Sequence, residues 1–426
     1  MTVLSSLRAA GAGGGLRGRS LVCSVAILLT AAMGSAVPGA WAVQADQLQD
    51  QSPIGAAAGG ALAQFRVALL RYSFTQKGPS AEDQSLDIIL LLPNREPQAW
   101  RVPVPSAWFA QDLRAAYRSI ASLQAPDPAP AGQPDRLYTL LLAPVRAILD
   151  QESITTLLIS ADRGFQAVPF AALHDGRRYM GERFSFALTP SLALTPLAVP
   201  AAITRPSATI AFGATEFQDS TDLPLAREEV ARVGEDAAAV FLDQQFTPEA
   251  LISGVARADV GRVHVASHAE FGPTGSHVFT GRGKLAFQEL NRASRSVDAD
   301  ALSLFYLSAC RTAVGDPAAE LGFSGLALQI GSDSAVGSLW NVNDLASAAF
   351  AVMFYRYLDQ GLVKSEAALA ARLVMIRGQL RVQGGDLYGP FPEPLVRGLT
   401  TEQARSIRLF HLPYFWAGMT VVGSPW

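Results

Sequence analysis

The chain has 426 residues, of which 49% are apolar and 17% are charged. This length and composition allow one large core or two ordinary ones, and they exclude a largely disordered protein. The formal net charge of −3 argues against a nucleic-acid partner, because such partners select a basic face.

Residues 1–42 have the layout of a secretory signal peptide. They contain three arginines and no acidic residue, an apolar run from Leu21 to Met33, and the small-x-small sequence Ala40-Trp41-Ala42. The apolar run is too short for a comfortable transmembrane helix, although an uncleaved anchor is the alternative reading. We therefore expect an exported bacterial protein, periplasmic or secreted, with no stable membrane span after cleavage.

Cleavage changes the charge and the cysteine count of the mature chain. Of the 34 Lys and Arg residues, three leave, so 31 face 37 Asp and Glu and the net charge becomes −6. Of the two cysteines, Cys23 is removed and Cys310 remains. A single thiol in an exported protein has no internal disulfide partner, so it is either buried and inert or kept for its reactivity.

Residues 43–64 are polar and rich in alanine and glycine, which predicts a flexible leader. Residues 65–135 are expected to form a small N-terminal unit that ends in a Pro-rich linker. Its expected elements are a strand at 86–92, a hairpin partner at 100–104, a helix at 110–123 and the linker at 125–134.

Residues 136–426 alternate between short apolar runs and helical patterns. Strands are expected at 155–160, 208–213, 260–266, 302–307, 334–340 and 419–422. Helices are expected at 137–149, 226–239, 248–256, 323–329, 345–359 and 365–379. Continuous apolar strands separated by helices predict an α/β fold with an open, mostly parallel sheet and helices on both faces.

Two chemically active side chains follow neighbouring expected strands. His268 comes directly after the strand at 260–266, and Cys310 follows the strand at 302–307. Sites in open α/β sheets form beyond the carboxyl ends of the strands. We therefore expect both side chains at one edge of the sheet, within hydrogen-bond reach.

A thiol and an imidazole in that position can perform nucleophilic catalysis. The imidazole takes the proton from the thiol as attack begins, and then protonates the leaving amine. Backbone N–H groups at Cys310 and just after His268, at Ala269, could hold the oxyanion. The alternative for Cys310 is a buried core thiol.

His264 and His268 also form an H-x-x-x-H pair. Zinc peptidases need that spacing on a helix, with Glu after the first histidine. Here Val265 follows and the segment is a predicted strand, so we expect no metal and no other cofactor. His264 is instead expected to pack and to help place His268.

Six segments, in order, resemble the CHAT domain, a bacterial relative of caspases, separases and gingipains. His268 lies in a segment similar to the family's "vHlAtH", and Cys310 in one similar to its "LSAC-x-T". The six segments are Ala161–Leu173, Thr189–Leu192, Val263–His268, Leu307–Ala313, Ser338–Asp344, and Pro413–Ala417 with Val422-Gly423.

The resemblance implies a caspase-like cysteine endopeptidase domain over residues 136–426, with Cys310 and His268 as its dyad and a protein or peptide as substrate. It also implies substrate-binding roles for Asp344 and Trp340, with Asp344 favouring Arg or Lys at P1. The alternative for Asp344 is a helix N-cap. The family usually has glycine after the catalytic histidine, where this chain has Ala269. A catalytically silent member that acts as a protein-binding or scaffold module is the competing function.

Overall fold

The computed structural model describes residues 66–76, 78, 83–93, 95–121, 135–161, 164–189, 208–218, 220–235, 237–271, 275–294, 302–309 and 330–426. Several predicted features lie outside these described residues. They are the signal peptide, the leader, the Pro-rich linker, the helix expected at 323–329 and Cys310.

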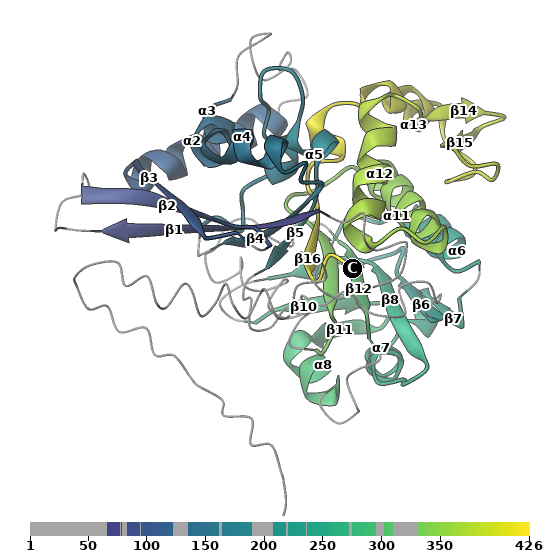
Figure 1. The fold of residues 1–426 in the computed structure, drawn as a ribbon. Coiled ribbons are helices and arrows are strands. Elements are labelled where there is room, and N and C mark those ends of the chain that lie inside the picture. The colour runs from purple at the N-terminus through teal and green to yellow at the C-terminus, as the bar shows by residue number, and fades with distance from the viewer. Residues whose placement is uncertain are drawn as a thin grey trace, which may run out of the picture. The chain divides into compact units, whose positions relative to one another are not determined.

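One sheet of 11 strands organises the described part of the chain (Figure 1). In spatial order its strands are β3 (Gln98–Pro103), β2 (Gln84–Leu91), β1 (Val67–Gln76), β4 (Thr156–Ala161), β5 (Ser185–Thr189), β16 (Met419–Gly423), β13 (Ser334–Ser338), β12 (Leu304–Ser308), β8 (Val260–Ala266), β6 (Ala208–Gly213) and β7 (Ala239–Leu242). Neighbours run parallel except in the β3–β2, β2–β1 and β16–β13 pairs. The expected open, mostly parallel sheet is confirmed.

Helices cover both faces of the sheet, as expected (Figure 1). Helices α6 (Ala226–Val233), α11 (Asp344–Asp359) and α12 (Lys364–Ile376) lie on one face, and α7 (Pro248–Val255) and α8 (Phe287–Ser294) on the other. Strand β8 shows how the sequence assigns the faces. Val263 and Val265 belong to the core under α7 and α8, whereas His264 between them contacts Tyr355 of α11, because successive strand side chains point to opposite faces.

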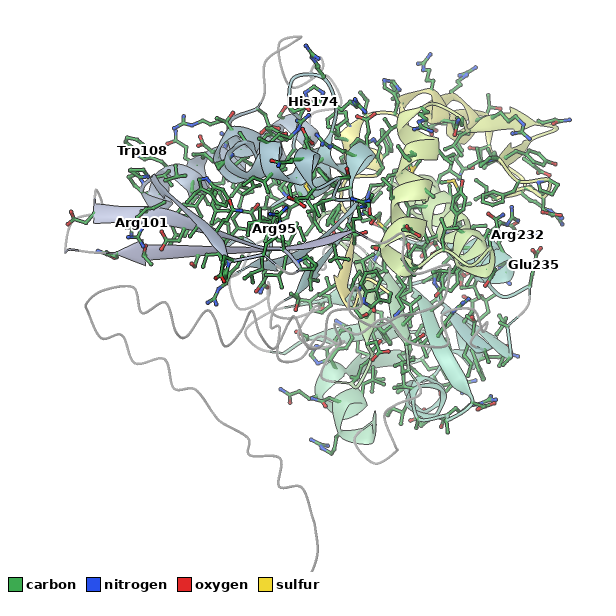
Figure 2. All side chains as sticks on the ribbon, viewed as in Figure 1. Arg95, Arg101, Trp108, His174, Arg232 and Glu235 are labelled. Carbon is green, nitrogen blue, oxygen red and sulfur yellow. The ribbon has the colours of Figure 1, made fainter. Side chains whose placement is uncertain are left out.

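The N-terminal unit extends the same sheet. Strands β2 and β3 form the expected hairpin, and Arg101 Nε lies 2.6 Å from Asp87 Oδ1 across it (Figure 2). Strand β1 was not predicted from the sequence; it pairs with β2 on one side and runs parallel to β4 on the other. Strands before and after the Pro-rich linker therefore share one hydrogen-bonded sheet.

Two predicted helices depart most from the structure. The helix expected at 137–149 is two helices, α3 (Arg136–Leu141) and α4 (Ala143–Gln151), because Pro144 lacks an N–H and can only stand near a helix start. The helix expected at 226–239 ends at Val233, before Gly234. The residues from Ala239 form the edge strand β7 instead.

The remaining elements are short or lie beside the sheet. They are α2 (Ser106–Ala121), which begins four residues earlier than expected, α5 (Met180–Arg183), α13 (Thr401–Ser406), the small sheet of β9 (Ala269–Glu270), β10 (His277–Thr280) and β11 (Gly283–Ala286), and the hairpin of β14 (Arg381–Gln383) and β15 (Asp386–Tyr388). Among the described residues, no helix combines the length and apolarity needed to cross a bilayer.

Candidate active site

The two strands that lead to His268 and Cys310 are neighbours. Strands β8 and β12 pair in parallel, with Ala266 opposite Ser308. The Ser267 N–H donates to the Ser308 carbonyl over 3.1 Å, which continues the pairing past the end of β8. His268 follows Ala266 by two residues, and Cys310 follows Ser308 by two. The predicted adjacency of the strands is confirmed, while Cys310 itself lies outside the described residues.

The imidazole of His268 is held by a backbone carbonyl. Its Nε2 lies 2.7 Å from the carbonyl oxygen of Thr221, in the loop between β6 and α6. A carbonyl only accepts, so we assign the ring proton to Nε2, which leaves the lone pair of the neutral ring on Nδ1. The rings of Phe217 and Phe279 pack beside the imidazole, with centroids 4.5 and 6.1 Å away. Sequence reasoning missed Thr221, because a carbonyl partner leaves no side-chain signature.

Ala269 presents its backbone in an ordinary extended conformation. It pairs with Val278 in the β9–β10 ladder, and it is not among the described residues with positive φ. The N–H of Phe279 donates to the His268 carbonyl over 2.9 Å. Because antiparallel pairs alternate, the next position is non-hydrogen-bonded and the Ala269 N–H points away from β10. Alanine can thus occupy this position without backbone strain.

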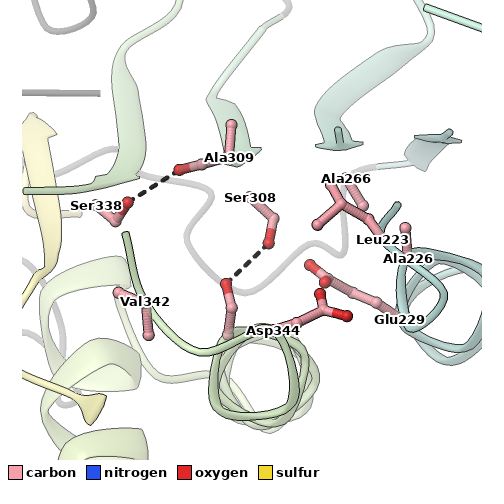
Figure 3. Close-up of a pocket in the computed structure, with 10 residues that line it drawn as sticks. Leu223, Ala226, Glu229, Ala266, Ser308, Ala309, Ser338, Val342 and Asp344 are labelled. Atoms are coloured by element: carbon pink, nitrogen blue, oxygen red, sulfur yellow. Dashed lines mark hydrogen bonds between the residues drawn. The ribbon is translucent and has the colours of Figure 1, made fainter. Parts of the chain in front are cut away.

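A pocket lies where β8, β12 and β13 end, against helices α6 and α11 (Figure 3). Its wall includes Ala309, the residue before Cys310, and two carboxylates, from Glu229 of α6 and Asp344 of α11. The other lining residues are apolar or serine: Leu223, Ala226, Ala266, Ser308, Ser338, Val342 and Ser347. The sequence analysis had placed Asp344 at this site and had missed Glu229.

Asp344 faces this pocket and does not cap its helix. Asn343 is the N-cap of α11, because its Oδ1 accepts the Ala346 N–H over 3.2 Å, so the N-cap reading of Asp344 is wrong. The Leu225 N–H donates to Asp344 Oδ2 over 3.4 Å, a long hydrogen bond. Burial and the nearby charge of Glu229 raise the pKa of Asp344 to about 6.

Trp340 is not among the residues that line this pocket. Its indole N–H donates to the Tyr414 carbonyl over 2.9 Å, and its ring meets Tyr117 of α2 edge-on at 5.7 Å. Gly418 packs so closely on the indole that a Cβ there would lie 2.9 Å from it. These contacts hold the segment between β13 and α11 against the other half of the sheet, and the structure does not bring Trp340 together with Asp344 in the pocket.

His264 is fully buried between the sheet and its helices. Its Nε2 lies 3.1 Å from Glu229 Oε1, yet neither atom has a hydrogen-bond partner among the described residues. The rings of Tyr306 and Tyr355 lie 5.0 and 5.4 Å away. His264 therefore contacts the pocket wall through Glu229. In the described part of the chain, no group of three or more His, Cys, Asp or Glu side chains could hold a metal ion.

Comparisons with known proteins agree with this arrangement. A family model described as CHAT domain matches residues 134–424. A chain of the Saccharomyces cerevisiae separase–securin crystal structure aligns with a TM-score of 0.50 and 11% identity, over 90% of this chain and 31% of that chain. This chain therefore spans about a third of the separase chain, and the likeness shows a shared fold.

Two gingipain structures are also similar. The Arg-specific cysteine proteinase gingipain R aligns with a TM-score of 0.41 and 10% identity, over 67% of this chain and 68% of that chain. The complex of Porphyromonas gingivalis RgpB pro- and mature domains gives the same score and identity over 68% and 70%. None of the curated proteins compared with the chain matches it. The family model spans well over half of the sequence, and the chain belongs to the CHAT domain family.

Proposed function

We propose that this protein is a cysteine endopeptidase in which Cys310 is the nucleophile and His268 the general base. One observation carries the proposal: His268 stands at the end of β8, fixed by Thr221, while the neighbouring strand β12 leads directly to Cys310. The fold of caspase-like cysteine peptidases supports the same assignment.

The steps of hydrolysis follow from that arrangement. The thiol proton passes to Nδ1 of His268 as the sulfur attacks the peptide carbonyl carbon. The N–H groups of Ala269 and Cys310 stabilise the oxyanion. The C–N bond then breaks, and the imidazolium returns its proton to the leaving amine. Water, activated by the same imidazole, hydrolyses the thioester and restores the thiol.

The substrate is a protein or peptide, and the preferred P1 residue is Arg or Lys. This part of the proposal is supported by Asp344, whose carboxylate lines the pocket beside Ala309. Trp340 acts on substrate indirectly, because its contacts with Tyr414 and Tyr117 fix the segment that carries Asp344. The protein is exported through its signal peptide at residues 1–42, so its substrates are periplasmic or extracellular.

The test is the rate at which iodoacetamide alkylates Cys310 from pH 5 to 9 in the mature protein. We expect rapid labelling near neutral pH, because a paired thiol forms its thiolate readily. His268→Ala should abolish the fast phase. His411→Ala, at an exposed histidine whose Nδ1 contacts only the Arg408 carbonyl in the described structure, serves as the matched control.

A digest of a peptide library then tests the reaction itself. Cleavage that is lost in Cys310→Ala and in His268→Ala supports the proposal. Slow labelling that His268→Ala leaves unchanged, together with no cleavage, would overturn it in favour of a silent binding module.

A further inference from the structure

We propose that Glu229 is a second specificity residue, which together with Asp344 binds the basic P1 side chain of the substrate. The inference rests on the proposed peptidase function and extends it to a residue on a different helix. It is motivated by the burial of the Glu229 side chain, by the direction of its carboxylate and by its charge. Among the described residues that line the pocket, none is basic.

Glu229 is a buried carboxylate that faces a pocket. Its residue is only 2% exposed, and its Oε1 has no hydrogen-bond partner among the described residues. It lines the pocket with Asp344, and Figure 3 shows the two carboxylates directed toward each other near Ser308. A buried carboxylate oxygen without a hydrogen-bond partner is costly, so this position favours a donor, and a positively charged donor most of all.

The two carboxylates oppose each other electrostatically when the pocket is empty. The charge of Glu229 is one of the causes that raise the pKa of Asp344 to about 6, after burial. A bound cation offsets both the repulsion between the carboxylates and the cost of their burial, because it offers each carboxylate an opposite charge and hydrogen-bond donors. A guanidinium suits this role, since its five N–H donors can serve two acceptors at once.

The other residues that line the pocket compete little with the two carboxylates for a cation. Three serines line it, yet they are already engaged: Ser308 Oγ lies 3.0 Å from Ser347 Oγ, and the Ser338 hydroxyl donates to the Ala309 carbonyl over 2.9 Å. Leu223 and Val342 provide apolar contact for a methylene stem. The carboxylates are therefore the strongest acceptors that the described lining offers to a cation.

The position of the pocket makes the cation a P1 side chain. Ala309 lines the pocket and directly precedes Cys310 in the chain, so the pocket adjoins the end of the strand that leads to the proposed nucleophile. Leu223 lines it too, two residues after Thr221, whose carbonyl holds His268. The pocket is thus connected to both members of the dyad through short stretches of backbone.

His264 gives Glu229 an alternative, purely structural role, because the two side chains are 3.1 Å apart. The test must therefore separate selectivity from folding. We would measure kcat/KM for one peptide with arginine at P1 and for the same peptide with citrulline, its uncharged isostere. The variants are Glu229→Gln and Glu229→Asp. The matched control is Glu235→Gln, at a half-exposed carboxylate just beyond the same helix (Figure 2).

We expect the arginine-to-citrulline ratio to fall about 10- to 100-fold in Glu229→Gln, the range for a lost hydrogen bond to a charged group. Glu229→Asp should keep part of the preference, and Glu235→Gln all of it. A folded Glu229→Gln variant that keeps the wild-type ratio would overturn the proposal. So would a wild-type enzyme that cleaves both peptides equally well, which would leave the peptidase function intact.

A binding measurement distinguishes the two proposals if no peptide is cleaved. In Cys310→Ala, N-acetylarginine methylamide should raise the thermal unfolding midpoint and the citrulline analogue should not, because a ligand stabilises the state that binds it. If adding Glu229→Gln abolishes this shift, the proposal that Glu229 binds a basic side chain is supported even though no peptide is cleaved and the peptidase proposal fails. No shift with either compound would overturn the pocket.

Discussion

Replacing Asp344 by asparagine should stabilise the free protein at neutral pH and have almost no effect in acid. The reason is that burial and Glu229 raise the pKa of this carboxyl from 3.8 to about 6. Between these two values the folded state binds more protons than the unfolded chain does. The free energy of unfolding therefore falls as the pH rises through this window, and the loss is complete above pH 6.

The shift sets the size of the effect. A difference of roughly two pKa units corresponds to about 3 kcal/mol at most. Asp344 is the first residue of α11, where the positive end of the helix favours a carboxylate by about 0.3–1 kcal/mol, and asparagine forgoes that gain. We therefore expect Asp344→Asn to be more stable than wild type by about 1–3 kcal/mol at pH 7, and by nearly nothing below pH 4.

Urea unfolding of both proteins from pH 3.5 to 8, followed by circular dichroism, measures this difference directly. The same variant should lose its preference for arginine at P1. The negative charge of Asp344 destabilises the free protein but attracts the substrate cation, so its removal affects stability and recognition in opposite ways. A stability difference that is the same at every pH, or a variant less stable than wild type at pH 7, would refute the reasoning.

Three further changes test the backbone donor and the two buried cations. Ala269→Pro removes the N–H proposed to stabilise the oxyanion, so it should lower kcat by about 100- to 1,000-fold while alkylation of Cys310 stays fast. Full activity in this variant would show that the Ala269 N–H takes no part in the mechanism. Arg372 is fully buried, its guanidinium lies 4.6 Å from the centre of the Phe186 ring, and its Nε and Nη1 have no hydrogen-bond partner among the described residues. Arg372→Met should therefore leave the free energy of unfolding unchanged or raise it by about 1–4 kcal/mol. A large loss of stability would contradict this. Burial lowers the pKa of Lys364 from 10.5 to about 8, so the unfolded chain binds more protons at this group between these values, and Lys364 contributes a rise in stability from pH 8 to 10.5. In urea titrations, Lys364→Met should remove that contribution, and an unchanged pH dependence would contradict this.

The sequence by itself determined the class of fold and the pairing of the two strands that precede His268 and Cys310. Short, mostly apolar runs such as Val260–Ala266 favour strands buried on both faces, and the helical patterns between them favour parallel connections. Parallel strands end at a common edge, so the paired ends of β8 and β12, at Ala266 and Ser308, lie side by side. Helix propensity predicted the ends of helices less well than their existence. At Pro144 and at Gly234, a single residue interrupted a helix that the sequence pattern had predicted to continue.

Only the tertiary structure decided which groups surround that edge. Glu229 reads in the sequence as one more charge on an amphipathic helix, and Thr221 as a loop residue. Packing of α6 against α11 buries Glu229 beside Asp344, and the loop before α6 brings the Thr221 carbonyl to His268. These two pairs of residues are 47 and 115 positions apart in the chain. Neither the Glu229 carboxylate nor the Thr221 carbonyl oxygen has a local sequence pattern that marks it as a site group. Local sequence fixes periodicity and strand ends, whereas the surroundings of a side chain are set by the packing of distant elements.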